Sequence, residues 1–202
     1  MKLVCLDLEG VLVPEIWIAF SEAAGIPELR LTTRDEPDYD KLMRYRLKIL
    51  KERGLGLPQI RRVIEGIRPL PGARTFLRRL RERAQVVILS DTFSQFAEPL
   101  MKQLGYPTLL CNELEVAPDG TITGYRMRAK HSKLSTVRAL QSVGIETIAA
   151  GDSYNDLEMI LAGRRGFLFR TTDAIRQAYP DIPAFTEYKA FLEALTAAVE
   201  EP

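Results

Sequence analysis

Short apolar runs and amphipathic segments alternate along most of the chain. Uninterrupted apolar runs are typical of strands buried on both faces of a parallel sheet, and they occupy residues 1–9, 86–91, 108–112, 147–152 and, more weakly, 166–169. Helical periodicity lies between them, over residues 73–83, 93–104, 132–142, 155–163 and 187–200. Strands that alternate with helices of this length predict right-handed βαβ units. We therefore expect an α/β fold with a doubly wound, Rossmann-like parallel sheet.

A long helical insertion interrupts this pattern. About eighty residues separate the ends of the first two expected strands, although one crossover requires only ~10–20. The surplus has helical periodicity, with breaks near residues 25–27, Pro37 and residues 54–58. The spacing predicts an inserted helical cap domain at residues 14–68, with residues 1–13 and 69–202 forming the α/β core.

A second and smaller insertion follows the third expected strand. Asp119-Gly120 lies between alternating apolar and polar residues in the segment 114–127. Because this dipeptide favours the tight turns that join antiparallel strands, the segment predicts a small β-hairpin.

The composition is that of a globular protein with a core, since 46% of the 202 residues are hydrophobic and 27% are charged. Cys5 and Cys111 lie inside apolar runs and are expected to be buried, reduced thiols. No apolar stretch approaches the ~20 residues that span a bilayer, and the N-terminus does not resemble a secretory signal. We expect a cytoplasmic protein without a membrane partner; whether it forms a homodimer is left open.

The overall net charge of +1 gives no sign of a nucleic-acid partner. Residues 41–68, however, hold nine Lys or Arg against two acids. The helix expected after Pro37 places Arg46 inside an apolar stripe formed by Tyr39, Leu42, Met43, Leu47 and Leu50. An unpaired inward charge is unfavourable, so Arg46 either pairs with a cap acid or binds an anionic ligand. The other basic residues point outward and favour a solvated face over a nucleic-acid interface.

Three of the expected strands end in polar side chains, which are Asp7 with Glu9, Ser90 with Asp91, and Asp152 with Asp156. Ligands of doubly wound sheets bind at the carboxyl ends of the strands, so we expect these side chains to meet. Two carboxylates 4 Å apart repel by ~4 kcal/mol at an effective dielectric of 20. A Mg²⁺ ion would offset that repulsion, and a phosphate ligand would require donors such as Ser90 and a lysine.

The order of these motifs resembles that of the haloacid dehalogenase superfamily. The matching residues are DLEGVL at 7–12, the strand-end serine at 90, a lysine before a helix at 133, and GDSYND at 151–156. A single motif is explained as well by a turn or a helix cap, but four in register favour the enzyme. The resemblance implies that Asp7 attacks phosphorus and becomes an aspartyl phosphate, while Glu9 acts as acid and base.

The same resemblance implies a magnesium site, with Asp7, Asp152 and the Glu9 carbonyl as ligands and Asp156 in support. Ser90 and the amide of Asp91 would bind the phosphoryl oxygens. Lys133 would neutralise charge, with Lys130 as the competitor for that role. Most phosphatases of the superfamily carry Asp at the position of Glu9, so the reach of this longer acid is open.

Three longer stretches of the chain resemble the bifunctional phosphoserine phosphatase/homoserine phosphotransferases of bacteria. These stretches are residues 7–20, 88–93 (ILSDTF) and 149–156 (AAGDSYND). The resemblance implies that phosphoserine and homoserine are the small-molecule partners and that substrate is contacted by Glu15, Arg46, Ser90, Asp91, Lys133 and Asn155. Serine and homoserine differ by one methylene, which one pocket distinguishes by only ~1–3 kcal/mol.

Several alternatives stay open at this point. An acid at position 15 could simply favour the helix dipole. The substrate could be another small phosphomonoester, and a phosphorylated signalling receiver also combines acids, a serine and a lysine on a doubly wound sheet. His131 is not expected to be catalytic, and Trp17 is expected to serve cap packing rather than substrate stacking.

Overall fold

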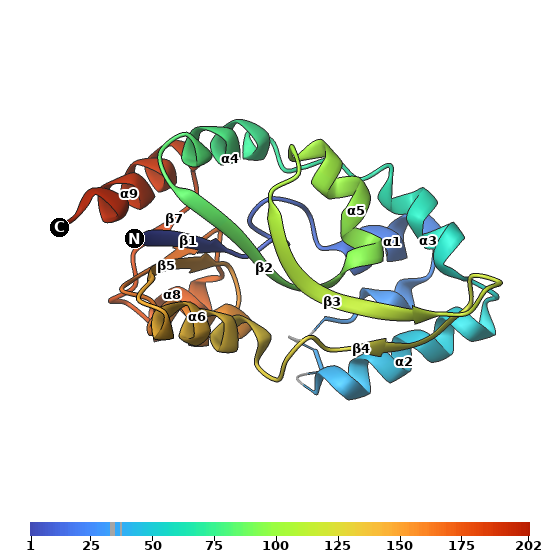
Figure 1. Ribbon diagram of the computed structural model, residues 1–202. Helices are drawn as coiled ribbons and strands as arrows, with labels where there is room; N and C mark the ends of the chain where they lie inside the picture. Colours follow the sequence, from blue (N-terminus) through green and yellow to red (C-terminus); the bar gives the residue numbers. More distant parts are fainter. Residues whose placement is uncertain (33–34, 37) are drawn as a thin grey trace.

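The computed structural model describes residues 1–32, 35–36 and 38–202, and Figure 1 shows a twisted sheet with helices on both faces. Within the described residues the sheet has seven strands in the order β4-β3-β2-β1-β5-β6-β7. The strands are β1 (Lys2–Leu6), β2 (Gln85–Phe93), β3 (Thr108–Val116), β4 (Ile122–Arg126), β5 (Glu146–Gly151), β6 (Arg165–Phe169) and β7 (Ala184–Phe185). All neighbours pair in parallel except β3 and β4, which are antiparallel. The predicted doubly wound sheet is confirmed.

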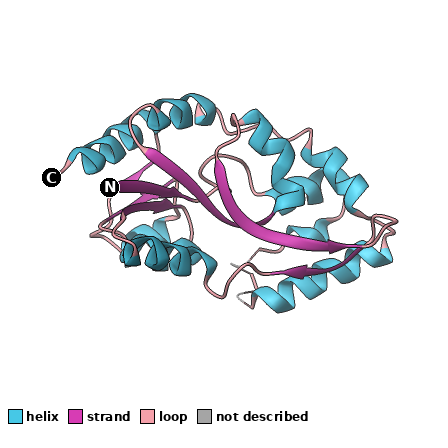
Figure 2. Cartoon of the chain, in the orientation of Figure 1, coloured by secondary structure: helices cyan, strands magenta, loops and turns pink. Residues whose placement is uncertain are grey.

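The α-helices fall into a core group and a group near the carboxyl edge of the sheet (Figures 1 and 2). The core group consists of α4 (Ala73–Arg81), α5 (Ser94–Gln103), α6 (Ser132–Ser142), α7 (Leu157–Ala162), α8 (Asp173–Ala178) and α9 (Tyr188–Glu200). The second group consists of α1 (Ile16–Ala24), α2 (Tyr39–Glu52) and α3 (Leu57–Ile64), with the 3₁₀ turn η1 (Pro27–Arg30). A further 3₁₀ turn, η2 (Tyr154–Asp156), precedes α7.

Alternate side chains of the central strands enter two separate apolar layers. Val4 and Leu6 belong to the larger cluster, which includes residues of α4, α5 and α9. Cys5, between them, belongs to the cluster formed with α6, α7 and α8. This period of two is the consequence of the pleat in a strand with helices on both faces, and it explains why residues 3–6 of β1 are all apolar.

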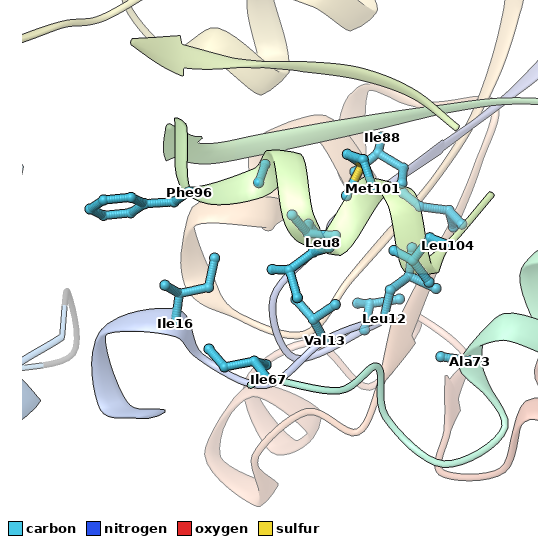
Figure 3. Packing of buried hydrophobic residues seen from close by; sticks show 14 of the residues in the cluster. Leu8, Leu12, Val13, Ile16, Ile67, Ala73, Ile88, Phe96, Met101 and Leu104 are labelled. Carbon is cyan, nitrogen blue, oxygen red and sulfur yellow. The ribbon is translucent and has the colours of Figure 1, made fainter. Parts of the chain in front are cut away.

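The loop after β1 is fixed by packing against α5. Figure 3 shows Leu8 of this loop beside the α5 helix that carries Met101, and both are buried in the larger cluster together with Val13 and with Leu104, the residue that follows α5. The backbone also folds back on itself, since the amide of Val13 donates to the Leu8 carbonyl at 3.1 Å. The residues that immediately follow the first strand therefore have a rigid support.

The regular secondary structure in the described residues of 14–68 is helical. Gly25 ends α1 in the left-handed conformation with φ of 65°, and the side chain of Asp38 caps α2 by accepting from the amide of Lys41. The break expected near Pro37 lies outside the described residues.

The expected hairpin turns at residues 117–121, where the amide of Gly120 donates to the Ala117 carbonyl at 2.9 Å. Its first arm is the continuation of β3 rather than a separate strand, so β3 pairs with β2 at one end and with β4 at the other. Figure 1 shows β4 running beside α2. Among the described residues, no helix is long and apolar enough to cross a membrane.

Candidate active site

The acid at the end of β1 lies at the centre of a buried cluster. Asp7 is 5% exposed, and its amide is held by the Ala150 carbonyl at 2.9 Å. Gly10 follows with φ of +78°, and a Cβ there would lie 2.5 Å from the carboxylate of Asp152. A glycine is therefore required at this position, both for the left-handed backbone and for the close approach of the two acidic loops.

Lys133 joins two of the acids. Its Nζ donates to Asp7 Oδ1 at 2.8 Å and to Asp156 Oδ1 at 2.6 Å. Burial opposes the positive charge of Lys133, but the carboxylates of Asp156 and Asp7 outweigh that effect and raise its pKa well above the ordinary value. Lys130, in contrast, is exposed. The structure thus brings Lys133, and not Lys130, into contact with the expected nucleophile.

Asp156 organises the loop after β5. Its Oδ2 accepts from the amides of Asp152 at 3.0 Å and of Ser153 at 3.1 Å, while its Oδ1 is taken by Lys133. Gly151 makes room for it, because a Cβ at that position would lie 2.2 Å from the Asp156 side chain. Because both of its carboxylate oxygens already accept hydrogen bonds, Asp156 is suited to support the residues of a metal site rather than to coordinate the metal directly.

Oxygen ligands suitable for Mg²⁺ converge in this cluster. Asp7, Asp152 and Asp156 are all buried and offer carboxylate oxygens within 4.8 Å of one another. Burial, followed by the charge of Asp156, raises the pKa of Asp7 well above its usual range in the absence of a metal. A hard divalent cation prefers carboxylate oxygens and would offset this repulsion, so these residues fit magnesium.

The end of β2 contributes a serine and a multiply bonded aspartate. Ser90 is 3% exposed, and its Oγ accepts from the amide of Thr92 at 3.2 Å. The carboxylate of Asp91 accepts from Ser132 Oγ at 2.8 Å and from Asn155 Nδ2 at 3.2 Å. Asp91 therefore connects the starts of α6 and η2, which carry Lys133 and the acidic loop.

Glu9 reaches the first turn of α1. Its Oε2 accepts from the amide of Ile16 at 2.8 Å, whereas Glu15 forms no side-chain cap on that helix. Burial, with a further contribution from the charge of Glu15, raises the pKa of Glu9 to about 8. A carboxyl group with such a pKa can hold a proton near neutral pH and release it, as general acid–base catalysis requires.

Arg46 points inward from α2, as the sequence predicts. It is 5% exposed, its guanidinium lies 4.4 Å above the ring of Trp17, and its Nη2 donates to the Leu31 carbonyl at 2.7 Å. Within the described part of the chain, its buried Nε has no hydrogen-bond partner. Burial lowers the pKa of Arg46 to about 10, which means that its charge is poorly compensated in this state.

One cavity brings together the expected site residues other than Asp156, which lies buried beneath it against Lys133. It is lined by Asp7, Glu9, Glu15, Arg46, Ser90, Asp91, Lys133, Asp152 and Asn155, with Trp17, Thr32, Tyr39, Thr92 and Ser153 in addition. The sequence prediction missed these additional residues as cavity residues. Trp17 also packs edge-to-face against Phe20 and Phe96, so the expected packing role is present as well. His131 lies outside this cavity and contacts Glu158 at 3.0 Å.

Five of the other basic residues at positions 41–68 pair with neighbouring acids in the described part of the chain. The pairs are Lys41–Glu36, Arg44–Asp40, Lys48–Glu52, Arg53–Glu28 and Arg61–Glu98. Such exposed pairs contribute little stability, but they form a mixed-charge surface. The basic residues that produce the local excess of positive charge therefore lie on a solvated face, as predicted.

The fold and the site define a doubly wound α/β protein with a cluster of acids and a lysine at the carboxyl edge of its sheet and an α-helical insertion that lines the same cavity. Residues 11–161 match the family model for haloacid dehalogenase-like hydrolases. The chain belongs to this family.

Relatives and solved structures agree with this assignment. The chain is 52% identical over 189 residues to phosphoserine phosphatase ThrH of Pseudomonas aeruginosa, covering 94% of this chain and 92% of the relative. It is 53% identical over 184 residues to a phosphoserine phosphatase of Pseudomonas syringae pv. tomato, covering 91% and 78%. A substrate-bound phosphoserine phosphatase has a TM-score of 0.76 at 21% identity, covering 96% and 97%. A phospho-aspartyl intermediate analogue of phosphoserine phosphatase has a TM-score of 0.75 at 20% identity, covering 96% and 98%, and both similarities concern the fold.

Proposed function

We propose that this protein is a magnesium-dependent enzyme that transfers the phosphoryl group of O-phosphoserine, through an aspartyl phosphate at Asp7, to water and to homoserine. The observation that carries the proposal is the combination, in one cavity, of the Asp7–Lys133 pair with the buried Arg46. The Asp7–Lys133 pair suits phosphoryl transfer. Arg46 suits the binding of an anionic group on the organic part of the substrate.

The residues can divide the reaction into two displacements. Asp7 attacks phosphorus, the bond from phosphorus to the serine oxygen breaks, and Glu9 donates a proton to the departing oxygen. Glu9 then accepts the proton of the attacking water or homoserine hydroxyl, and Asp7 leaves as a carboxylate. The raised pKa of Glu9, to about 8, supports its role as the proton donor in the first step.

The remaining groups would bind the transferring phosphoryl group. Ser90 Oγ and the amide of Asp91 would donate to its oxygens, and Lys133 would neutralise charge beside Asp7. Asp7, Asp152 and the Glu9 carbonyl would hold Mg²⁺, with Asp156 fixing their loop. When bound, the metal neutralises charge on the phosphoryl oxygens and orients them.

The charges around the cavity support an amino-acid substrate. Arg46 can bind a carboxylate through its planar guanidinium. Glu15 lines the same cavity, and its carboxylate could bind the ammonium group of the substrate. A zwitterionic phosphomonoester such as phosphoserine meets both requirements.

Homoserine as acceptor is the finer part of the proposal. It carries the same two charged groups as serine, so the contacts that hold the donor would hold the acceptor after serine has left. The insertion at residues 14–68 would act as a cap domain over a core formed by residues 1–13 and 69–202, because it supplies Glu15, Trp17, Tyr39 and Arg46 to one wall of the cavity. A closed cap would keep water from the intermediate.

Product analysis tests this proposal. The purified protein is incubated with phosphoserine and Mg²⁺, with and without homoserine, and inorganic phosphate and phosphohomoserine are measured. We expect both products when homoserine is present and phosphate alone when it is absent. If neither product forms, the proposed substrate is wrong.

A further inference from the structure

A tyrosine at the start of α2 connects the cap to the phosphoryl-binding end of β2. Tyr39 is the first residue of α2 and lines the catalytic cavity. Its hydroxyl donates to the carbonyl oxygen of Asp91 at 3.1 Å, across 52 positions of sequence. The contact therefore joins the insertion directly to the segment that holds Ser90.

The peptide group that Tyr39 contacts is also fixed from the core. Asn112 Nδ2 donates to the same Asp91 carbonyl at 3.1 Å, and the amide of Thr92 donates to Ser90 Oγ at 3.2 Å. The orientation of the peptide and the position of the serine hydroxyl are thus coupled. Among these contacts, that of Tyr39 is the one that cap movement would break.

A second tyrosine supports the first from outside the cavity. The hydroxyl of Tyr125, on β4, donates to the carboxylate of Asp40, the next residue of α2. The rings of Tyr39 and Tyr125 meet edge-to-face with centroids 6.0 Å apart, and Tyr125 also contacts the ring of Phe93. The first turn of α2 is therefore held against the β2–β3–β4 side of the core.

We propose that Tyr39 is a positioning residue that fastens the closed cap to the Asp91 peptide and thereby sets how the phosphorylated enzyme partitions between water and an amino-acid acceptor. This role rests on the proposed function, because it concerns the choice between hydrolysis and transfer. Because cap residues form one wall of the cavity, exchange of serine for the acceptor requires the cap to move. Each opening also exposes the aspartyl phosphate to water, so a weaker contact shifts the reaction toward hydrolysis.

The change Tyr39→Phe removes the hydroxyl and keeps the ring. Tyr45→Phe is the matched control, since Tyr45 lies on the same helix and is 39% exposed. At a fixed homoserine concentration, the ratio of phosphohomoserine to phosphate is independent of the amount of active enzyme. From the net strength of one neutral hydrogen bond, we expect this ratio to fall roughly two- to tenfold in Tyr39→Phe and to stay unchanged in Tyr45→Phe.

A second readout requires no turnover. Trp17 is the single tryptophan of the chain, it lines the cavity, and it is 7% exposed in this closed arrangement. Acrylamide quenching of its fluorescence therefore reports cap opening. We expect quenching to increase in Tyr39→Phe and to match the wild type in Tyr45→Phe.

The two readouts separate the possible failures. An unchanged product ratio, or a lower ratio without increased quenching, overturns the proposed role of Tyr39. If the wild type makes no phosphohomoserine, the transfer proposal fails, and quenching alone decides whether Tyr39 holds the cap. Increased quenching then supports the fastening contact, and equal quenching overturns it.

Discussion

Arg46 offers the sharpest test of the substrate class. Replacing it with alanine removes a buried guanidinium whose partners are the Leu31 carbonyl, the Met43 sulfur and the Trp17 ring. None of these partners carries a charge. The proposed substrate carboxylate would be the group that compensates Arg46, so its removal should affect substrates that have a carboxylate and spare those that lack one.

The size of the effect follows from this environment. Burial lowers the pKa of Arg46 to about 10, so the free enzyme compensates the charge poorly and the bound anion interacts with it strongly. Truncating one partner of a buried, hydrogen-bonded charge pair costs about 2–5 kcal/mol. At 1.36 kcal/mol per tenfold change, kcat/KM for phosphoserine should fall roughly 30- to 5,000-fold in Arg46→Ala.

Steady-state kinetics with two substrates would measure this effect. Phosphoethanolamine retains the phosphate and the ammonium group of phosphoserine but lacks the carboxylate, so Arg46→Ala should change its kcat/KM less than about threefold. Lys48→Ala is the matched control, because Lys48 lies on the same helix with 72% of its side chain exposed, and neither substrate should be affected. Equal losses for both substrates, or no loss for phosphoserine, would refute the assignment and favour another phosphomonoester.

Three further predictions concern the acidic cluster. Lys133→Met leaves Asp7 and Asp156 buried without their cation, so the free energy of unfolding in urea should fall by about 3 kcal/mol or more, whereas Lys130→Met should have little effect; equal losses would contradict the burial argument. Glu9 has its pKa raised from 4.5 to about 8 in the folded state, so the folded protein binds more protons than the unfolded chain and the stability of the metal-free protein should decrease as pH rises through this range. Mg²⁺ binds ionised carboxylates, so the rise in Tm on adding Mg²⁺ should be larger at the upper end of this pH range than at the lower end. The opposite trend would contradict this explanation. Gly10→Ala and Gly144→Ala introduce the same left-handed strain, at φ of +78° and +81°, but only the first places a Cβ against Asp152; phosphatase activity should therefore be lost in Gly10→Ala and kept in Gly144→Ala, and equal activities would show that the two loops can separate.

The sheet and the acids at its edge could be predicted because both have a strong local signal. A strand with helices on both faces has an uninterrupted apolar run, as residues 3–6 of β1 do, and this strand ends where Asp7 begins the functional loop. Parallel strands end at the same edge, so the order of the motifs implied that Asp7, Ser90 and Asp152 would meet. By contrast, the pattern did not predict α8 or β7, and the two residues of β7 are too few for any periodicity.

The role of Tyr39 could not be predicted in the same way. Its ring fits the apolar stripe of α2, and periodicity therefore identified it only as a packing residue. Its hydroxyl donates to the backbone carbonyl of Asp91. Because every residue has a backbone carbonyl, the sequence does not indicate which one accepts this hydrogen bond. The hydrogen bond that the Ile16 amide donates to Glu9 could not be predicted either, because a backbone donor is also independent of the residue type. Contacts between a side chain and a backbone group that is distant in the sequence can be identified only once the fold is known.

The central claim is that Asp7 becomes phosphorylated during turnover. The most direct measurement is a rapid acid quench of the protein reacting with phosphoserine and Mg²⁺, followed by proteolysis and mass spectrometry to locate the phosphoryl group. We expect one phosphoryl group on Asp7 in the wild type and none in Asp7→Asn, and this variant should also release no phosphate. A phosphoryl group on another residue, or undiminished turnover by Asp7→Asn, would contradict it.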